Sequence, residues 1–211
     1  IAFSRAFDSI IHSKLLAKLS AYGVSGPLHM WIAAFLRDRE QYVRIKNCLS
    51  PTVCVRSGVP QSSVLGPILF ILYINDVTDI LVDDVSCKLY ADDLKLYCPI
   101  VPTLGFSESL QTSLDNLCDW SLKWQLPINV DKSFFVTISR NNICNCVHSY
   151  RILCSLLTRR FSVDDLGIAY DCNLCFDNYV NNIASSAKAK VGLLFRSFKT
   201  RDPALLKRAY V

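Results

Sequence analysis

The sequence has no long hydrophobic run, no internal repeat and no low-complexity segment. Its longest nearly apolar stretch, Val64 to Ile74, is too short to cross a bilayer, and no signal peptide opens the chain. Charged residues are also few, at 19% against 51% apolar residues. This balance excludes a disordered chain, and 211 residues allow one or two domains. Because the apolar run is short, no membrane partner is expected.

The chain lacks a large excess of one charge, but its small excess is unevenly placed. There are 23 basic and 18 acidic residues, a net charge of +5. From position 177 onward, seven basic residues stand against two acidic ones, so this stretch carries the whole excess. It could bind a polyanion or simply be the solvated surface of a helix. The seven basic residues are Lys188, Lys190, Arg196, Lys199, Arg201, Lys207 and Arg208.

The ten cysteines lack a regular spacing. Cys144, Cys146 and His148 together with Cys172 and Cys175 resemble a zinc set only loosely, because the first pair is too close for the usual loop between ligands. A chain of this length and apolar content needs no disulfide framework. We therefore expect reduced, mostly buried thiols in an intracellular protein, and no zinc.

Apolar periodicity predicts helices alternating with hairpin-joined strands. Helices are expected to begin near Ser13 and Ser25, and to cover about 64–76, 110–124, 180–198 and the stretch after Asp202. Strands are expected at 41–45 and 51–55, at 85–98 as a hairpin, and at 134–139, 150–155 and 166–170. This order predicts an α+β fold rather than a doubly wound parallel sheet.

Tyr90-Ala91-Asp92-Asp93 carries the clearest chemical signal. Two adjacent carboxylates in a turn repel one another unless a cation lies beside them, and hard oxygen ligands suit magnesium. The dipeptide alone is weak evidence, because Asp is a common turn residue and Asp83-Asp84 and Asp164-Asp165 repeat it.

Five ordered stretches strengthen this signal, and together they resemble the reverse transcriptases of non-LTR (LINE-like) retrotransposons. The resemblance covers essentially the whole chain at ordinary spacings. The stretches are Phe3 to Asp8, Ser57 to Asp76, Tyr90 to Asp93, Trp120 to Asn129 with Lys132, and Asp165 to Asp171.

The resemblance implies a polymerase palm, an antiparallel sheet with helices packed on one face, followed by a partial helical thumb. Residues 1–160 would be the palm, and 161–211 the primer-end strand and the start of the thumb; the fingers would be missing and the chain a fragment. The family extends a DNA primer along an RNA template, using deoxynucleotide triphosphates and two Mg²⁺ ions. Such a protein is expected in the cytoplasm and nucleus.

The resemblance also implies roles for individual residues. Asp92 and Asp93 match the paired metal-binding and catalytic carboxylates, Asp92 the more firmly. The positions that match the nucleotide site are Phe7, an aromatic gate against a ribose 2′-hydroxyl, together with Gly58, Pro60, Gln61 and Lys132. Nucleic-acid contacts are expected at Trp124, Gly167, Lys188, Lys190, Arg196 and Lys199. The helical spacing of Trp124 from Trp120 also predicts a core anchor, one that could border the nucleic-acid channel.

Two positions depart from the family pattern. Ala2 occupies the place of the first-motif Asp, and a methyl group cannot coordinate a cation, so the site loses one of three carboxylates. Asp8 is not expected to replace it, because the family pattern already has an Asp there. Ser62 stands where the loop usually has Gly, which would strain a left-handed turn by about 1 kcal/mol. We therefore expect impaired or absent activity.

Several alternatives remain open from the sequence. The chain could be a nucleic-acid-binding relic without catalysis, or a structural or interaction remnant of the fold. An RNA-templated RNA polymerase fits less well, because of the Phe7 gate and the stretch from Pro60 to Pro67. The basic residues from Arg37 to Lys46 could contact phosphates or be solvated. The resemblance favours nucleic-acid contact for the basic stretch after position 177.

Overall fold

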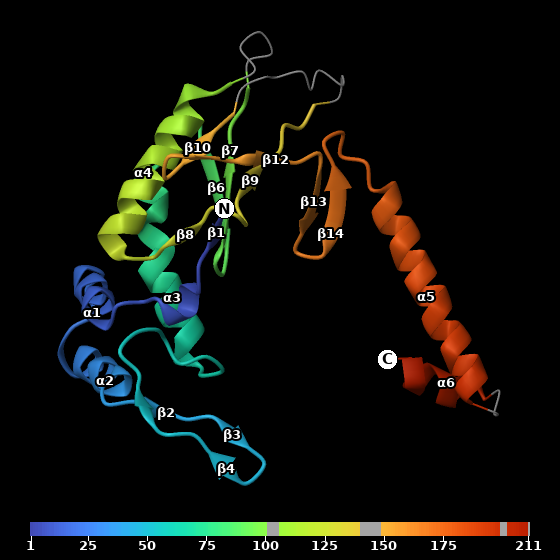
Figure 1. Cartoon of the computed structure of the whole chain (residues 1–211), viewed down its shortest axis with the longest axis horizontal. Helices are drawn as coiled ribbons and strands as arrows, with labels where there is room; N and C mark the ends of the chain where they lie inside the picture. Colours follow the sequence, from blue (N-terminus) through green and yellow to red (C-terminus); the bar gives the residue numbers. More distant parts are fainter. Residues whose placement is uncertain (101–105, 140–148, 199–201, 211) are drawn as a thin grey trace. The chain divides into compact units, whose positions relative to one another are not determined.

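A computed structural model describes residues 1–100, 106–139, 149–198 and 202–210. The chain forms two compact units, one of residues 1–134 with 146–158 and one of residues 135–145 with 159–211. Helices and antiparallel strands are mixed along the sequence, as Figure 1 shows, and this confirms the predicted α+β class.

An antiparallel four-stranded sheet forms the centre of the first unit (Figure 1). Its order is β6 (Ser86–Tyr90), β7 (Asp93–Tyr97), β1 (Ala2–Phe3) and β8 (Ile128–Asn129). Successive strand residues face opposite sides of a sheet. Phe3, Leu94 and Ile128 lie on one face and are almost completely buried. Ala2, Asp93 and Asn129 therefore share the other face.

The helices of this unit begin within two residues of the expected positions. Pro27 stands in the first turn of its helix, where a missing N–H costs nothing. The Ser107 hydroxyl accepts a hydrogen bond from the Leu110 amide at 3.2 Å and caps another helix. The helices are α1 (His12–Ala21), α2 (Gly26–Leu36), α3 (Leu65–Ile74) and α4 (Glu108–Trp124), with 3-10 helices η1 (Ala6–Asp8) and η2 (Asn75–Ile80).

The predicted hairpin after α2 is confirmed as an exposed two-stranded ribbon. β2 (Glu40–Gln41) pairs with β5 (Val53–Cys54), and β3 (Arg44–Ile45) pairs with β4 (Cys48–Leu49). Every residue from 37 to 54 is exposed, including the basic ones, so these charges remain in water.

One predicted strand is wrong, because the backbone turns back within it, and another is shorter than expected. The expected strand at 150–155 is a hairpin of β10 (Arg151–Ile152) and β11 (Ser155–Leu156), with Leu153 and Cys154 between them at φ 47° and 64°. Gln111 of α4 continues the pairing of β10, since its amide accepts from and donates to the Arg151 backbone at 2.9 and 3.0 Å. The expected strand at 134–139 is limited to β9 (Phe134–Phe135), and β12 (Thr158–Arg159) follows the hairpin.

In the second unit, the predicted strand at 166–170 likewise begins in a turn. β13 (Ser162–Asp165) and β14 (Ile168–Asp171) pair across Leu166 and Gly167, whose φ values are 51° and 83°. Positive φ at both loop residues is the type I′ pattern that suits the twist of a hairpin.

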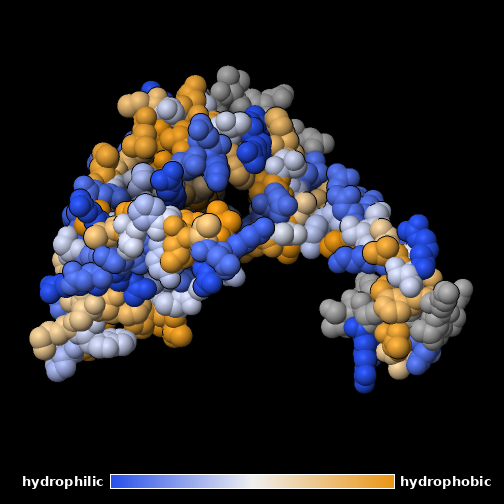
Figure 2. Space-filling model, turned by 60° about the horizontal axis from the view of Figure 1, so that its bottom comes forward, coloured by the Kyte–Doolittle hydropathy of each residue, from blue (hydrophilic) through white to orange (hydrophobic). Residues whose placement is uncertain are grey.

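Two helices complete this unit, α5 (Asp177–Ser197) and α6 (Pro203–Tyr210). α5 has no buried residue, and Figure 2 shows hydrophobic side chains beside hydrophilic ones on this helical part. In the described part of the chain, no helix combines the length and apolar character needed to span a bilayer.

A buried ammonium group connects four helical elements of the first unit, α1, α3, η2 and α4. Lys18 of α1 is only 4% exposed, and its Nζ lies 2.5 Å from both Asp76 Oδ1 and the Tyr73 carbonyl. The same Nζ lies over the rings of Tyr73, Trp120 and Trp124 at 4.8, 4.8 and 3.8 Å. Burial lowers the pKa of Lys18, and the hydrogen bond and charge of Asp76 act against this shift.

We expect removal of the counter-ion to destabilise the first unit. Asp76→Ala leaves the Lys18 charge without its partner and should lower the free energy of unfolding by about 3 kcal/mol. Asp79→Ala, an exposed carboxylate on the same 3-10 helix, should change it by less than about 0.5 kcal/mol. Urea unfolding measures both variants, and equal losses would contradict a special role for Asp76.

Tyr73 should make stability fall in alkali. Burial, with the charge of Asp76 as a smaller cause, raises the pKa of Tyr73 from 10.0 to about 12. The folded state then holds a proton that the unfolded state releases. Stability is complete below pH 10 and is lost as the pH rises through 12, by about 2.7 kcal/mol. Tyr73→Phe should remove this part of the pH dependence in urea titrations. An unchanged slope in the variant would exclude Tyr73 as its source.

Candidate functional site

The register of the sheet places Ala2 directly beside the first residue of β7. Ile1 and Leu94 exchange both backbone hydrogen bonds, at 2.8 and 3.2 Å. Ala2 and Asp93 are the next pair, and therefore a non-hydrogen-bonded one. Such pairs have their Cα atoms about 4.5 Å apart and their side chains close together. The Ala2 methyl group and the Asp93 carboxylate are thus neighbours on the open face of the sheet.

The tip of the β6–β7 hairpin is a two-residue loop of Ala91 and Asp92. Tyr90 and Asp93 are the last paired residues, so the carboxylates predicted at the tip are divided between the loop and the start of β7. Ala91 has φ 51°, a left-handed conformation that costs a residue with a Cβ about 1–2 kcal/mol. Asp93 is exposed and Asp92 half-buried.

Asn129 lies on the other side of Ala2, so Asp93, Ala2 and Asn129 form a row across three strands on the open face of the sheet. The sequence did not single out Asn129. Its Oδ1 accepts from the Lys132 backbone amide at 3.1 Å, and its carbonyl accepts from the Ser133 hydroxyl at 2.7 Å. The Ser133 Oγ in turn accepts from the Ala2 amide at 3.1 Å. This turn brings exposed Lys132 to the strand that carries Ala2. The only sequence signal for Asn129 was its place at the end of the motif Trp120 to Asn129, with Lys132 beyond it.

Four residues after Ala2, η1 begins, and it is held against the loop of residues 57–61. The Gly58 amide donates to the Ile10 carbonyl at 2.7 Å, and the Gly58 carbonyl lies 2.7 Å from His12 Nε2. Gly58 has φ 85°, and a Cβ there would lie 2.8 Å from the Cα of Asp8. Only glycine fits, because both its conformation and the backbone contact exclude a side chain.

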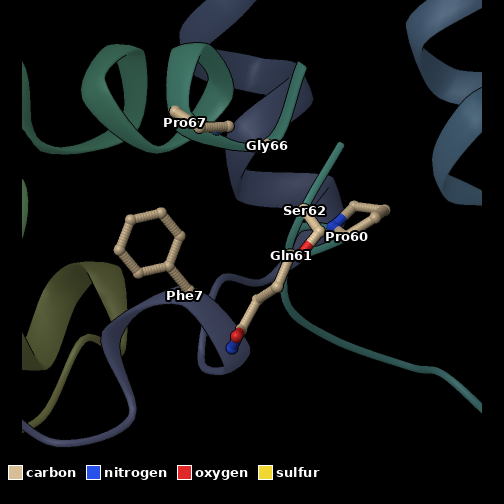
Figure 3. A pocket seen from close by; sticks show the side chains of 6 residues that line it. All are labelled: Phe7, Pro60, Gln61, Ser62, Gly66 and Pro67. Carbon is tan, nitrogen blue, oxygen red and sulfur yellow. The ribbon is translucent and has the colours of Figure 1, made fainter. Parts of the chain in front are cut away.

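A pocket of about 210 Å³ opens beside this contact (Figure 3). The Phe7 ring stacks on Phe70 of α3 with ring centroids 4.2 Å apart, which fixes one wall. The helix approaches so closely that a Cβ on Gly66 would lie 2.4 Å from the Pro60 carbonyl oxygen. The lining residues are Phe7, Pro60, Gln61, Ser62, Gly66 and Pro67.

Ser62 adopts φ 62°, which confirms the left-handed turn expected where the family usually has Gly. The next residue supports this turn: the Ser63 hydroxyl donates to the Pro60 carbonyl at 2.6 Å and accepts from the Gly66 amide at 2.9 Å. The loop is therefore formed in spite of the side chain at position 62.

The expected nucleic-acid contacts fall in different parts of the chain. Trp124 belongs to the first unit, where its ring lies against Lys18 at 3.8 Å and Lys123 at 5.5 Å. Gly167 is in the β13–β14 turn. Lys188, Lys190 and Arg196 are exposed on α5, whereas Lys199 lies outside the described residues. Cys144, Cys146 and His148 of the loosely zinc-like set also lie outside them.

Comparison with known proteins decides the family. The sequence pattern of the protein family "Reverse transcriptase (RNA-dependent DNA polymerase)" matches residues 1–183. The chain is a member of the reverse transcriptase family. This result confirms the family inferred from the five motifs.

Relatives of this reverse transcriptase include proteins of mobile elements. It is 30% identical over 193 residues to the "RNA-directed DNA polymerase from mobile element jockey" of Drosophila funebris, covering 89% of this chain and 21% of the relative. The protein of the same name from Drosophila melanogaster is 30% identical over 194 residues, with the same coverage. The "Probable RNA-directed DNA polymerase from transposon BS" of Drosophila melanogaster is 28% identical over 182 residues, covering 83% and 20%. The chain thus spans about a fifth of the length of these relatives.

The described residues do not fit the Mg²⁺ site that the family implies. No three of their His, Cys, Asp and Glu side chains are grouped closely enough to hold an ion. The residue beside Asp93 on β1 is Ala2, and its methyl group cannot coordinate an ion. Asp8 does not supply the carboxylate that position 2 lacks. It lies on η1, and its Oδ1 accepts from Gln61 Nε2 at 2.9 Å.

The loop contact gives a matched pair of glycine variants. Gly58→Ala meets both a positive φ and the Asp8 backbone, whereas Gly23→Ala has φ 84° with nothing within 4 Å. We expect Gly23→Ala to cost about 1 kcal/mol of stability and Gly58→Ala about 3 kcal/mol or more. Denaturant unfolding measures the difference. Equal costs would contradict a tight contact between the loop and η1.

Proposed function

We propose that this chain is the palm and the start of the thumb of an RNA-directed DNA polymerase from a non-LTR retrotransposon. The observation that carries the proposal is the row of Ala2, Asp93 and Asn129 on the open face of the sheet, with the pocket of Phe7 and Gln61 on the same segment of chain. A sheet with one helix-covered face and one open face suits a polymerase palm. Residues 1–160 would form this palm, and α5 and α6 the first part of the thumb.

In this proposal the pocket receives the incoming deoxynucleotide. The stacked Phe7 ring would lie under the sugar and reject a 2′-hydroxyl by its bulk. Gly58, Pro60 and Gln61 would form the wall against the base, and Lys132 would contact the triphosphate. RNA template and DNA primer would run beside the open face. The basic side chains of α5, Lys188, Lys190 and Arg196, would contact their phosphates, with Lys199 beyond the described helix.

We further propose that the chain as it stands does not catalyse nucleotide transfer. Asp92 and Asp93 provide carboxylates from one hairpin only, and Ala2 provides none from the strand between β7 and β8. Two magnesium ions held about 4 Å apart need carboxylates on both sides. Ala2 therefore favours a second candidate function, a nucleic-acid-binding protein that keeps the fold and has lost the chemistry.

The register predicts how the site responds when a carboxylate is restored at position 2. Ala2→Asp puts like charges side by side, so the variant should be less stable than the original chain by about 0.5–1 kcal/mol without divalent cations. About 10 mM Mg²⁺ should restore about 1.4 kcal/mol in this variant alone, if its affinity is near 1 mM. Ala2→Asn is the matched control, because it has the same shape and no charge. A cation response equal in all three proteins would contradict the proposed site.

Primer extension on an RNA template tests the function itself. We expect no incorporation by the original chain and incorporation by Ala2→Asp that Asp92→Asn abolishes. Salt-sensitive binding of an RNA–DNA duplex without incorporation by Ala2→Asp would favour the non-catalytic candidate. Absence of both binding and incorporation would contradict both candidates.

A further inference from the structure

A side-chain hydrogen bond joins η1 to Gln61, a polar residue that lines the pocket. Gln61 Nε2 donates to Asp8 Oδ1 at 2.9 Å. An ionised carboxylate can only accept hydrogen bonds, so the NH₂ group of Gln61 must face Asp8. The carboxamide oxygen Oε1 is then the atom turned away from Asp8.

The backbone holds Asp8 in place for this contact. The Asp8 amide donates to the Arg5 carbonyl at 2.9 Å, and its carbonyl accepts from the Ser57 hydroxyl at 2.9 Å. The Gly58 backbone packs so tightly on Asp8 that no Cβ fits between them. Figure 3 shows the Gln61 side chain extending from its loop toward the turn that carries Phe7. The Asp8 backbone is therefore fixed, and its exposed carboxylate meets the exposed Gln61 side chain from a defined position.

We propose that Asp8 is a positioning residue, which fixes the Gln61 carboxamide so that the pocket presents a hydrogen-bond acceptor. The second N–H of Gln61 can still donate, but a ligand group that meets Oε1 must be a donor. The nature of that ligand rests on the proposed function: in a deoxynucleotide, the donors are the sugar 3′-hydroxyl and the amino group of a base. The orientation itself does not depend on the proposed function.

Two side-chain changes separate the charge of Asp8 from its size. Asp8→Asn keeps the shape, but its amide can either donate or accept, so both orientations of Gln61 become possible. Asp8→Ala removes the partner altogether. Asp83→Asn and Asp83→Ala are matched controls, because Asp83 is an exposed carboxylate in a turn of the same unit.

Nuclear magnetic resonance of the nitrogen-15-labelled 211-residue chain reads the orientation directly. Gln61→Ala assigns the side-chain NH₂ resonances of Gln61. We expect Asp8→Ala to move them toward those of a solvated glutamine and to speed their hydrogen exchange, while the Asp83 variants leave them unchanged. The spectrum also shows whether each variant is folded. Identical Gln61 NH₂ resonances in the original chain and a folded Asp8→Ala variant would overturn the positioning role.

Nucleotide binding then identifies the donor. The probes are deoxyadenosine triphosphate, its 3′-deoxy analogue and its analogue without the base amino group. The original chain should bind the analogue that lacks the recognised donor about tenfold more weakly, and Asp8→Asn should reduce this preference to about threefold or less. Asp83→Asn should keep the full preference.

The outcomes separate this inference from the proposed function. Weaker binding of the 3′-deoxy analogue by the original chain assigns the sugar hydroxyl, and weaker binding of the analogue without the base amino group assigns the base. Equal affinity for all three probes in the original chain would overturn the acceptor assignment. Binding of none of them, with the Gln61 resonances still dependent on Asp8, would overturn the nucleotide pocket of the proposed function and leave the positioning role supported.

Discussion

The buried charge of Lys18 is the interaction on which the helical layer of the first unit depends. Its desolvation is unfavourable, as the lowered pKa indicates, and it is offset only where a carboxylate and aromatic faces meet it. Asp76 accepts from both Lys18 and the Trp120 indole N–H, the latter at 3.0 Å. Trp120 in turn packs against Phe3 of β1, with ring centroids 6.3 Å apart. The ammonium group is thereby linked to the strand whose opposite face carries Ala2.

The segment from Ala2 to Asp8 connects the two halves of the candidate site. Its first part is a central strand and its second part a 3-10 helix held by the loop around Gly58. A strand paired on both sides cannot slide without breaking two registers at once. The sheet row and the pocket are therefore positioned by the same few residues, and a shift in one would be transmitted directly to the other.

The sequence predicted the parts of the fold that have a local signal. The β6–β7 hairpin followed from alternation around Ala91 and Asp92. Gly58 was matched to the nucleotide site by the family resemblance, and the structure shows a close backbone approach there. The nature of that approach could not be predicted, because the contact is with the Asp8 backbone, 50 positions away in the sequence. The strand expected at 166–170 is wrong at Leu166 and Gly167, because the turn preference of Gly outweighs the alternation there.

Tertiary contacts account for what the sequence could not reveal. A lysine on an amphipathic helix is expected in water, so nothing local indicated that Lys18 is buried against Asp76, which lies on another helix. Trp124 was assigned to nucleic acid from its motif, and the structure shows its ring within this same cluster. Asn129 could join the candidate site only when strand order was known, because β8 follows β7 in sequence but pairs with β1.

Position 2 separates folding from chemistry in this chain. A carboxylate beside Asp93 would be destabilised by like-charge repulsion whenever no cation is bound, whereas the Ala2 methyl group imposes no such cost. Gly58 shows the opposite case, since any side chain there disrupts the contact with η1 on which the pocket depends. Substitution at position 2 can therefore remove a metal ligand while the strand register, the pocket and the basic side chains of α5 persist. A protein with this pattern can retain nucleic-acid binding after synthesis has been lost, because phosphate contacts need basic side chains and not the carboxylate row.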